Sequence, residues 1–295
     1  MKIRTLYILI IVTVGLMCSC GNRSMRDAKP VITVSLEPQK YFLDKIVGDK
    51  MQVECLLKNG ANPENYEPAM NDFVMLERSV AYLKMGNMEF ENVLVEKLKQ
   101  NNKSLVIFDT SRGVEYIKGT HDCCEHHHNH SHHHELSADP HTWTSVKNAK
   151  IIAHNMLDVV RGVDSINADY YKINYENLIA QLDSLDCYAS EKLASHRGES
   201  FLVWHPSLSY FARDYGLEQI AIGQIGKELS ARQLQEQIEK ANVYGVKVFF
   251  FQQEFDSRQA SVINDQIGAE MITINPLNYE WEAEIRRIID AIASK

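Results

Sequence analysis

Strand-like apolar runs alternate with stretches of helical apolar spacing along the first half of the chain. The runs predict strands at 31–36, 52–57, 80–86 and 104–110. Apolar residues at three- and four-residue steps predict helices at 41–48, 72–79, 90–101 and 145–160. Strands that alternate with helices are typical of parallel βαβ units. We therefore expect residues 30–165 to form an N-terminal α/β lobe.

The second half of the chain repeats this pattern. Strand-like runs cover 201–205, 246–253 and 270–276, and helical spacing covers 230–245 and 278–294. Ser230 suits the N-cap of the first of these helices, and Gly245 suits its C-terminal stop. We expect residues 197–295 to form a C-terminal α/β lobe.

One long helical segment separates the two halves. Residues 167–196 contain no Gly or Pro, and large apolar residues such as Tyr171, Leu178 and Leu185 recur at helical steps. At 1.5 Å per residue such a helix would be about 45 Å long, which exceeds most helices inside one compact domain. The predicted fold class is α/β, with two lobes that each hold a mostly parallel sheet flanked by helices, joined by one rigid backbone helix at 166–196. The alternative is a surface helix of one larger domain.

The N-terminus has the pattern of an export signal. Lys2 and Arg4 precede the apolar run "LYILIIVTVGLM", which ends in "CSCGN". The run is too short and too early for a membrane-spanning helix. "GLMCSC" resembles a bacterial lipobox, so we expect a lipoprotein signal at 1–19, lipidation of Cys20 rather than Cys18, and a polar tether at 20–29. The alternative is a plain secretory signal.

Composition narrows the range of partners. The chain has 295 residues, and 45% of them are hydrophobic, which is typical of a globular protein. Its formal net charge is -8 at pH 7, so the protein is acidic. An acidic body disfavours nucleic acid as a partner, and we expect a monomer held at a membrane surface by a lipid anchor. No CxxC pair occurs, and the sequence leaves open whether Cys55 and Cys187 pair.

Metal-ligating side chains stand at the ends of several predicted strands. Glu64 and Glu67 follow the strand 52–57, His205 ends the strand 201–205, and Asn275 lies near the end of 270–276. His141 stands in the rigid context "DPHTW" before a helix. Parallel α/β sheets bind ligands outside the carboxyl ends of their strands. Two imidazoles and a carboxylate suit Zn²⁺ and also Mn²⁺ or Fe²⁺.

Two other features bear on this site. The three tryptophans, Trp143, Trp204 and Trp281, each fall within six residues of His141, His205 or Asn275, so their rings are expected to wall a pocket. Taken singly, however, a strand-end histidine is more often structural, and Glu64 in a polar loop would usually be a solvated surface charge.

Several segments together carry a resemblance to a known family. "GANPENYEP", "DPHTW", "VWHPSLSYFARDYGL", "FFQQEF" and "INPLNYEW" are similar to the ligand segments of the solute-binding lipoproteins of metal-ion ABC importers, the zinc and manganese group. The resemblance covers essentially the whole mature chain. It implies a protein of the cell envelope that captures a divalent ion and delivers it to an ABC permease, and that is not an enzyme.

The resemblance also implies a ligand set, with two departures. Glu64 stands where the family usually has a histidine, and Asn275 stands where many members have an aspartate. The implied ligands are Glu64, His141 and His205, completed by Asn275, Glu67 or water. Zn²⁺ is the favoured cargo, and a manganese or iron protein of the same family is the alternative.

A histidine-rich tract, "HDCCEHHHNHSHHHE", occupies 121–135, where the family commonly carries such a loop when the cargo is zinc. The segment has almost no apolar content, so we expect it to be disordered without metal. Its candidate secondary ligands are His121, His126, His127, His128, His130, His132, His133 and His134. Because ordering a loop is entropically unfavourable, we expect weaker, multiple binding there and tight binding between the lobes. The alternative is a solvated insertion without a role.

Two further classes compete with the transport interpretation. A His₂Glu set with an open position also occurs in zinc enzymes, but the sequence has no HExxH helix and no separate carboxylate placed as a general base. The other class is a surface metal buffer or adhesin that serves no transporter.

Overall fold

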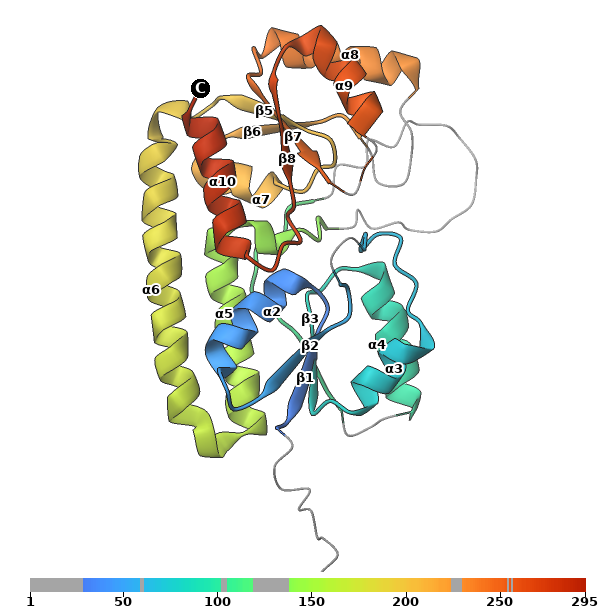
Figure 1. Ribbon diagram of the computed structural model, residues 1–295, viewed down its shortest axis with the longest axis vertical. Helices are drawn as coiled ribbons and strands as arrows, with labels where there is room; N and C mark the ends of the chain where they lie inside the picture. Colours follow the sequence, from blue (N-terminus) through green and yellow to red (C-terminus); the bar gives the residue numbers. More distant parts are fainter. Residues whose placement is uncertain are drawn as a thin grey trace, which may run out of the picture.

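The computed structural model describes residues 29–58, 61–101, 105–118, 138–223, 230–253, 255 and 257–295. Two lobes, each built on a four-stranded parallel sheet, lie one above the other, and the helix α6 (Ala168–Lys192) runs along both of them (Figure 1). The predicted fold class is confirmed. Within the described ranges, no helix combines the length and apolar character needed to cross a bilayer.

The N-terminal sheet has the strand order β2-β1-β3-β4, with every neighbouring pair parallel. Its strands are β1 (Val31–Val34), β2 (Gln52–Cys55), β3 (Ala81–Lys84) and β4 (Val106–Asp109). The helices of this lobe are α2 (Glu37–Val47), α3 (Met70–Glu77), α4 (Glu89–Asn101) and α5 (Val146–Val163). Ser145 caps α5, since its side chain accepts a hydrogen bond from the backbone N–H of Asn148.

The C-terminal sheet repeats this order as β6-β5-β7-β8, again parallel throughout. Its strands are β5 (Ser200–Val203), β6 (Glu218–Ala221), β7 (Val248–Gln252) and β8 (Glu270–Ile274). The helices are α7 (Ser209–Tyr215), α8 (Ala231–Val243), α9 (Ser257–Ile267) and α10 (Trp281–Ala293).

The apolar pattern of the sequence did not predict three of these elements. The strand β6 has four residues at the sheet edge, and only Ile220 among them is buried. The helix α7 has seven residues and ends at Gly216, whose φ of 70° stops the helix in a left-handed turn. The helix α9 was also not predicted. The two short elements β6 and α7 carry too few apolar positions for periodicity to reveal them. The helix α9 has 11 residues and buries Ala260 and Ile263 at a three-residue step, so its length does not explain why it was missed.

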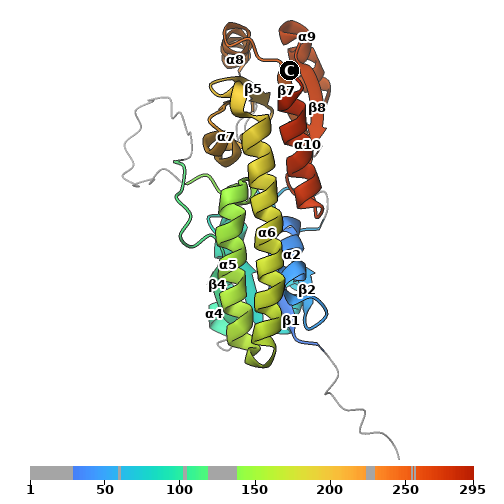
Figure 2. The same ribbon diagram turned by 90° about the vertical axis from the view of Figure 1, so that its left-hand side faces the viewer.

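The long helix α6 joins the lobes through packing on both sides. Its buried face is formed by Tyr171, Leu178, Leu182, Leu185 and Ala189. Figure 2 shows α6 beside α5 and α2 at one end and beside α10 at the other. The large apolar core extends from the N-terminal sheet through α6 to one face of the C-terminal sheet, and a second cluster covers the opposite face of that sheet. A wide hinge motion would have to open this shared core.

Polar contacts reinforce the same junction. Lys150 of α5 lies 3.0 Å from the Asp186 carboxylate of α6, and the Tyr215 hydroxyl of α7 donates to the other oxygen of that carboxylate at 3.0 Å. One side chain of α6 thus contacts a helix of each lobe. Cys187, also on α6, is exposed, whereas Cys55 is buried in β2, and neither is in a disulfide.

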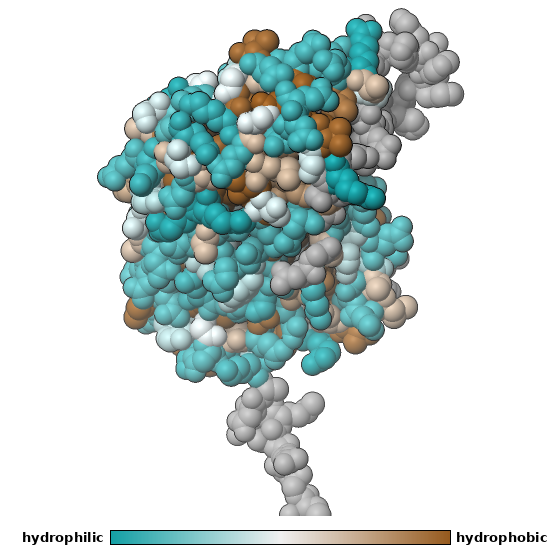
Figure 3. Space-filling view, turned by 45° about the horizontal axis from the view of Figure 1, so that its top comes forward, coloured by the Kyte–Doolittle hydropathy of each residue, from teal (hydrophilic) through white to brown (hydrophobic). Residues whose placement is uncertain are grey.

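The molecular surface is mainly hydrophilic in the view of Figure 3, with apolar side chains interspersed over the C-terminal lobe. The exposed apolar residues of that lobe include Val243 and Val262, which are 83% and 62% exposed. A largely polar surface agrees with the acidic composition of the chain.

Candidate metal centre

Three loops meet between the lobes. Glu64 lies in the loop after β2, His141 directly precedes the 3₁₀ turn Thr142–Thr144 that leads into α5, and His205 follows β5. The segment that leads into α5 passes between the two lobes (Figure 1). Both sheets therefore turn the carboxyl ends of these strands toward the same region, as the strand-end rule predicts.

The donor atoms of these three residues are close together. His205 Nε2 lies 3.0 Å from Glu64 Oε1 and 3.1 Å from His141 Nε2. All three donors fall within 4.8 Å of one another, and they form the one such group of His, Cys, Asp and Glu among the described residues. Zinc bonds of about 2.0–2.2 Å at tetrahedral angles separate two ligands by about 3.3 Å. The donors thus stand near the spacing that one cation requires.

The hydrogen bonding of this group is incomplete. Glu64 Oε1 is buried and has no hydrogen-bond partner among the described residues, although His205 Nε2 lies within contact distance. His141 and His205 are only 4% and 6% exposed, and their ring centroids lie 5.0 Å apart. A buried carboxylate oxygen without a partner is costly. A cation at the meeting point of the three donors would satisfy them together.

Burial also sets the protonation state of His205. Desolvation lowers the pKa of His205, and the nearby imidazole of His141 lowers it further, while the Glu64 carboxylate acts in the opposite direction. The ring of Phe255 stacks on His205 at a centroid distance of 5.7 Å. His205 is therefore neutral near pH 7, which is the form that binds metal.

Asp139 orients His141, a role that the sequence did not reveal. Its Oδ1 accepts from the backbone N–H of His141 at 2.9 Å and from Nδ1 of the same ring at 2.8 Å. Burial alone would raise the pKa of Asp139, but the hydrogen bonds and electrostatic attraction of His141 hold this pKa below its usual value. With Nδ1 donating to Asp139, Nε2 of His141 keeps its lone pair for a cation. The signal was present in "DPH", two residues before the histidine.

Gln252 holds the backbone of His205. Its Oε1 accepts from the His205 N–H at 3.1 Å, and its Nε2 donates to the His205 carbonyl at 2.7 Å and to Ser207 Oγ at 2.8 Å. Gln252 is the last residue of β7 and is fully buried. The only sequence signal was a polar residue that ends the otherwise apolar strand "VFFFQ".

A small cavity of about 20 Å³ lies at the three donors, enough for a single ion or water. The residues that line it are Asn62, Pro63, Glu64, His141, Trp143, His205, Ser207, Phe255, Pro276 and Leu277. Of the three tryptophans expected to wall the pocket, Trp143 alone does so. Trp204 packs against Phe251, and Trp281 packs against Phe42.

Neither candidate fourth ligand lines the cavity. The Asn275 side-chain oxygen accepts from the backbone N–H of Leu277 at 3.1 Å, and Asn275 is not among the residues that line the cavity. Glu67 is exposed and does not line it either. Cys20 and the histidine-rich tract 121–135 lie outside the described residues, so their predicted roles remain predictions.

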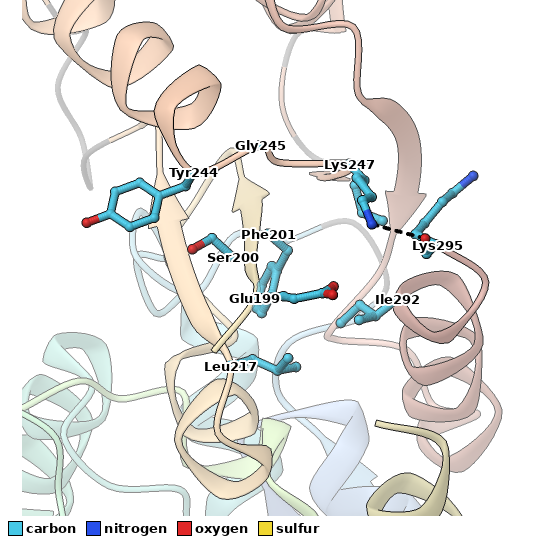
Figure 4. Close-up of a pocket in the computed structure, with 10 residues that line it drawn as sticks. Glu199, Ser200, Phe201, Leu217, Tyr244, Gly245, Lys247, Ile292 and Lys295 are labelled. Atoms are coloured by element: carbon cyan, nitrogen blue, oxygen red, sulfur yellow. Dashed lines mark hydrogen bonds between the residues drawn. The ribbon is translucent and has the colours of Figure 1, made fainter. Parts of the chain in front are cut away.

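A larger cavity of about 170 Å³ lies at the other end of the C-terminal sheet, where β5 and β7 begin. Figure 4 shows Glu199, Lys247 and Lys295 around it. Lys247 Nζ donates to the Lys295 carbonyl at 3.1 Å. No histidine lines this cavity, and its charged side chains are Glu199, Lys247 and Lys295, the last of which pairs with Glu270, so the cavity lacks a set of converging metal ligands.

Comparison with known proteins connects this geometry to a family. Residues 32–294 match the family model for ZnuA, described as zinc-uptake complex component A, periplasmic. The chain belongs to the ZnuA family. The members of this family are extracytoplasmic solute-binding proteins of ABC zinc transport. They work with the permease components of the transporter and are not enzymes.

Individual ZnuA-type relatives agree with this assignment. The high-affinity zinc uptake system protein ZnuA of Bacillus subtilis is 28% identical over 272 residues, which cover 89% of this chain and 85% of the relative. A crystal structure of ZnuA superposes with a TM-score of 0.80 at 31% identity over 90% of this chain and 98% of that one. The zinc-binding lipoprotein AdcA of Streptococcus pneumoniae is 28% identical, but the alignment spans 91% of this chain and 54% of AdcA. The match to AdcA thus covers about half of that protein.

Proposed function

We propose that this ZnuA-family protein captures Zn²⁺ with Glu64, His141 and His205 and hands it to its ABC permease. The observation that carries the proposal is that one donor atom each of Glu64, His141 and His205 lie within 4.8 Å of one another at a small cavity, with both histidines buried. Two neutral nitrogen donors and one carboxylate form a ligand set that zinc accepts readily. For the remaining position we propose water in preference to Asn275 or Glu67, since neither of these two lines the cavity.

The ligand assignment is tested by single substitutions. In His205→Ala we expect the zinc affinity to fall by at least about 100-fold, since one of three protein donors is lost, while circular dichroism stays unchanged. His154→Ala is the matched control, because His154 lies exposed on α5, away from the cavity. Affinity is measured by competition with a chelator of known strength. Near-native zinc binding by His205→Ala would exclude this residue as a ligand.

Zinc is the proposed cargo over manganese and iron. Imidazole nitrogen favours zinc, whereas manganese prefers more oxygen donors. Elemental analysis of the protein purified from cells, followed by competition with Mn²⁺ and Fe²⁺, distinguishes these ions. A protein that arrives with manganese, and keeps it against equimolar zinc, would refute the choice of cargo while leaving the site intact.

We also propose that Cys20 carries a lipid that anchors the protein at a membrane. Support comes from the sequence "GLMCSC" and from the relative named as a lipoprotein. Cys20→Ser should move the protein from the membrane fraction to the soluble fraction, and Cys18→Ser should leave it in place. The reverse result would assign lipidation to Cys18.

For the histidine-rich tract we propose weaker binding of several ions beside the tight site. Replacement of residues 121–135 by a Gly/Ser linker should remove the weak binding events and preserve the tight one in a zinc titration. Loss of the tightest event with the tract would contradict this division.

A further inference from the structure

Two buried tryptophans, Trp143 and Trp281, each donate an indole hydrogen bond across the lobe junction. The Trp143 indole Nε1 donates to the carbonyl of Pro276 at 2.9 Å, and the Trp281 indole Nε1 donates to the carbonyl of Trp143 at 2.8 Å. Each side chain is 1% exposed. Both hydrogen bonds are therefore shielded from water.

These two hydrogen bonds join segments that are far apart in the chain. Trp143 stands in the 3₁₀ turn between His141 and α5. Pro276 and Trp281 flank the turn from β8 to α10 in the C-terminal lobe. The ring of Trp281 also packs edge-on against Phe42 of α2, at a centroid distance of 4.8 Å. The brace formed by Trp143 and Trp281 thus connects the C-terminal lobe with the helices of the N-terminal lobe.

The brace forms part of the wall of the metal cavity. Trp143 and Pro276, which share one of its hydrogen bonds, both line the cavity. The Trp143 ring centroid lies 5.2 Å from that of His141. Asp139 holds His141 from one side of its turn, and the brace holds the turn two residues further on. Movement of the C-terminal lobe away from this wall would break both hydrogen bonds of the brace.

Breaking the brace would be unfavourable for a defined reason. Indole N–H groups find partners when they are buried. Separation of the two segments without water entry would leave two donors and two acceptors unpaired, and each loss is penalised by the full desolvation of the group. The braced arrangement is therefore strongly favoured over one in which the separated groups stay dry, and it is favoured over a hydrated open wall by the smaller net free energy of two hydrogen bonds.

We propose that Trp143 and Trp281 are positioning residues that keep the metal cavity closed and slow the release of zinc. The proposal rests on the role of His141 as a ligand. Without the brace, the chain would populate open forms of the wall, and the apparent affinity would fall with the population of the closed form. Zinc would also escape faster, because the open wall offers a path out.

The test uses Trp143→Phe and Trp281→Phe, which keep an aromatic ring and remove the N–H. Trp204→Phe is the matched control, because Trp204 packs against Phe251 within its own lobe. Zinc dissociation is followed by stopped flow after mixing loaded protein with excess chelator, and affinity is measured by chelator competition. We expect each brace variant to release zinc about tenfold faster and to bind it about tenfold more weakly. The control should stay within about twofold of the native protein.

Two results would overturn the proposal. If the brace variants lower the melting temperatures of apo and loaded protein equally, with native affinity and dissociation rate, the tryptophans serve the fold alone. If Trp204→Phe accelerates release as much as the brace variants do, the interlobe hydrogen bonds are not the cause. His141→Ala in the same series tests the ligand on which the proposal rests. Native affinity in that variant would refute the ligand set, whereas weakened binding there together with native release by the brace variants would refute the brace alone. Should phenylalanine prevent folding, benzothienylalanine at the same position keeps the bicyclic shape without the N–H.

Discussion

Replacement of Gln252 by leucine should damage the metal site without touching a ligand. Leucine nearly fills the space of glutamine but cannot exchange hydrogen bonds with the His205 backbone. The His205 carbonyl retains the Ser207 N–H at 2.7 Å, whereas the His205 N–H has no second partner among the described residues. A buried donor left unpaired costs about 1–3 kcal/mol. Since the unfolding free energy of a domain is about 5–15 kcal/mol, the variant should still fold but with clearly reduced stability.

The assay is urea unfolding of the apo protein together with zinc affinity. Gln253→Leu is the matched control, since the neighbouring Gln253 side chain is exposed. We expect Gln252→Leu to lose about 1–3 kcal/mol of unfolding free energy relative to this control. It should also bind zinc about 10–100-fold more weakly, as is typical when a residue that orients a ligand is lost. Equal stability and equal affinity in the two variants would refute the assigned role of Gln252.

A second variant adds a pH signature to this test. In Gln252→Glu one carboxylate oxygen can still accept from the His205 N–H, but the other must be protonated to donate to the His205 carbonyl. Burial raises the pKa of such an acid in the folded protein above its unfolded value near 4.3. Its stabilising contribution is therefore present at low pH and lost as the pH rises through the folded pKa. Relative to the native protein, the variant should be more stable at pH 5 than at pH 7.5, and a flat difference would contradict this.

Three other outcomes follow from the structure. Asp139→Asn should weaken zinc binding about 10–100-fold with native circular dichroism, and the exposed Asp158→Asn should leave binding unchanged. Because the pKa of His205 is lowered by burial below the unfolded value near 6.5, the unfolded chain takes up a proton first as the pH falls. The apo protein should therefore lose stability below about pH 6.5, and the His205→Ala variant should lose less stability over the same range. Zinc affinity should also fall in this pH range, because a protonated histidine cannot bind the metal. Finally, Cys55 is buried and its pKa is raised by desolvation. Iodoacetamide should therefore label Cys187 in the native protein and Cys55 only after unfolding, as read by peptide mass spectrometry.

The pattern of apolar residues determined the α/β class, both lobes and the long helix between them. Periodicity is a local property, since the residues that form one buried face lie within a few positions of one another. It failed for β6 and α7, which are too short to repeat a pattern, and the longer helix α9 was also missed. The strand-end rule then selected Glu64, Glu67, His205 and Asn275 as candidates, because it depends only on where each strand ends. His141 was added from its "DPHTW" context, and the family resemblance implied Glu64, His141 and His205 with the fourth ligand left open.

Only the tertiary structure decided which of these candidates meet and what holds them. Asn275 ends a strand as His205 does, yet its side chain bonds to Leu277 outside the cavity lining. The contact between Gln252 and His205 spans 47 positions, and that between Trp281 and Trp143 spans 138. A hydrogen bond between such distant residues leaves no periodic trace in the chain. The sequence thus determined the elements and the donor types, and the packing of the two lobes determined the coordination geometry.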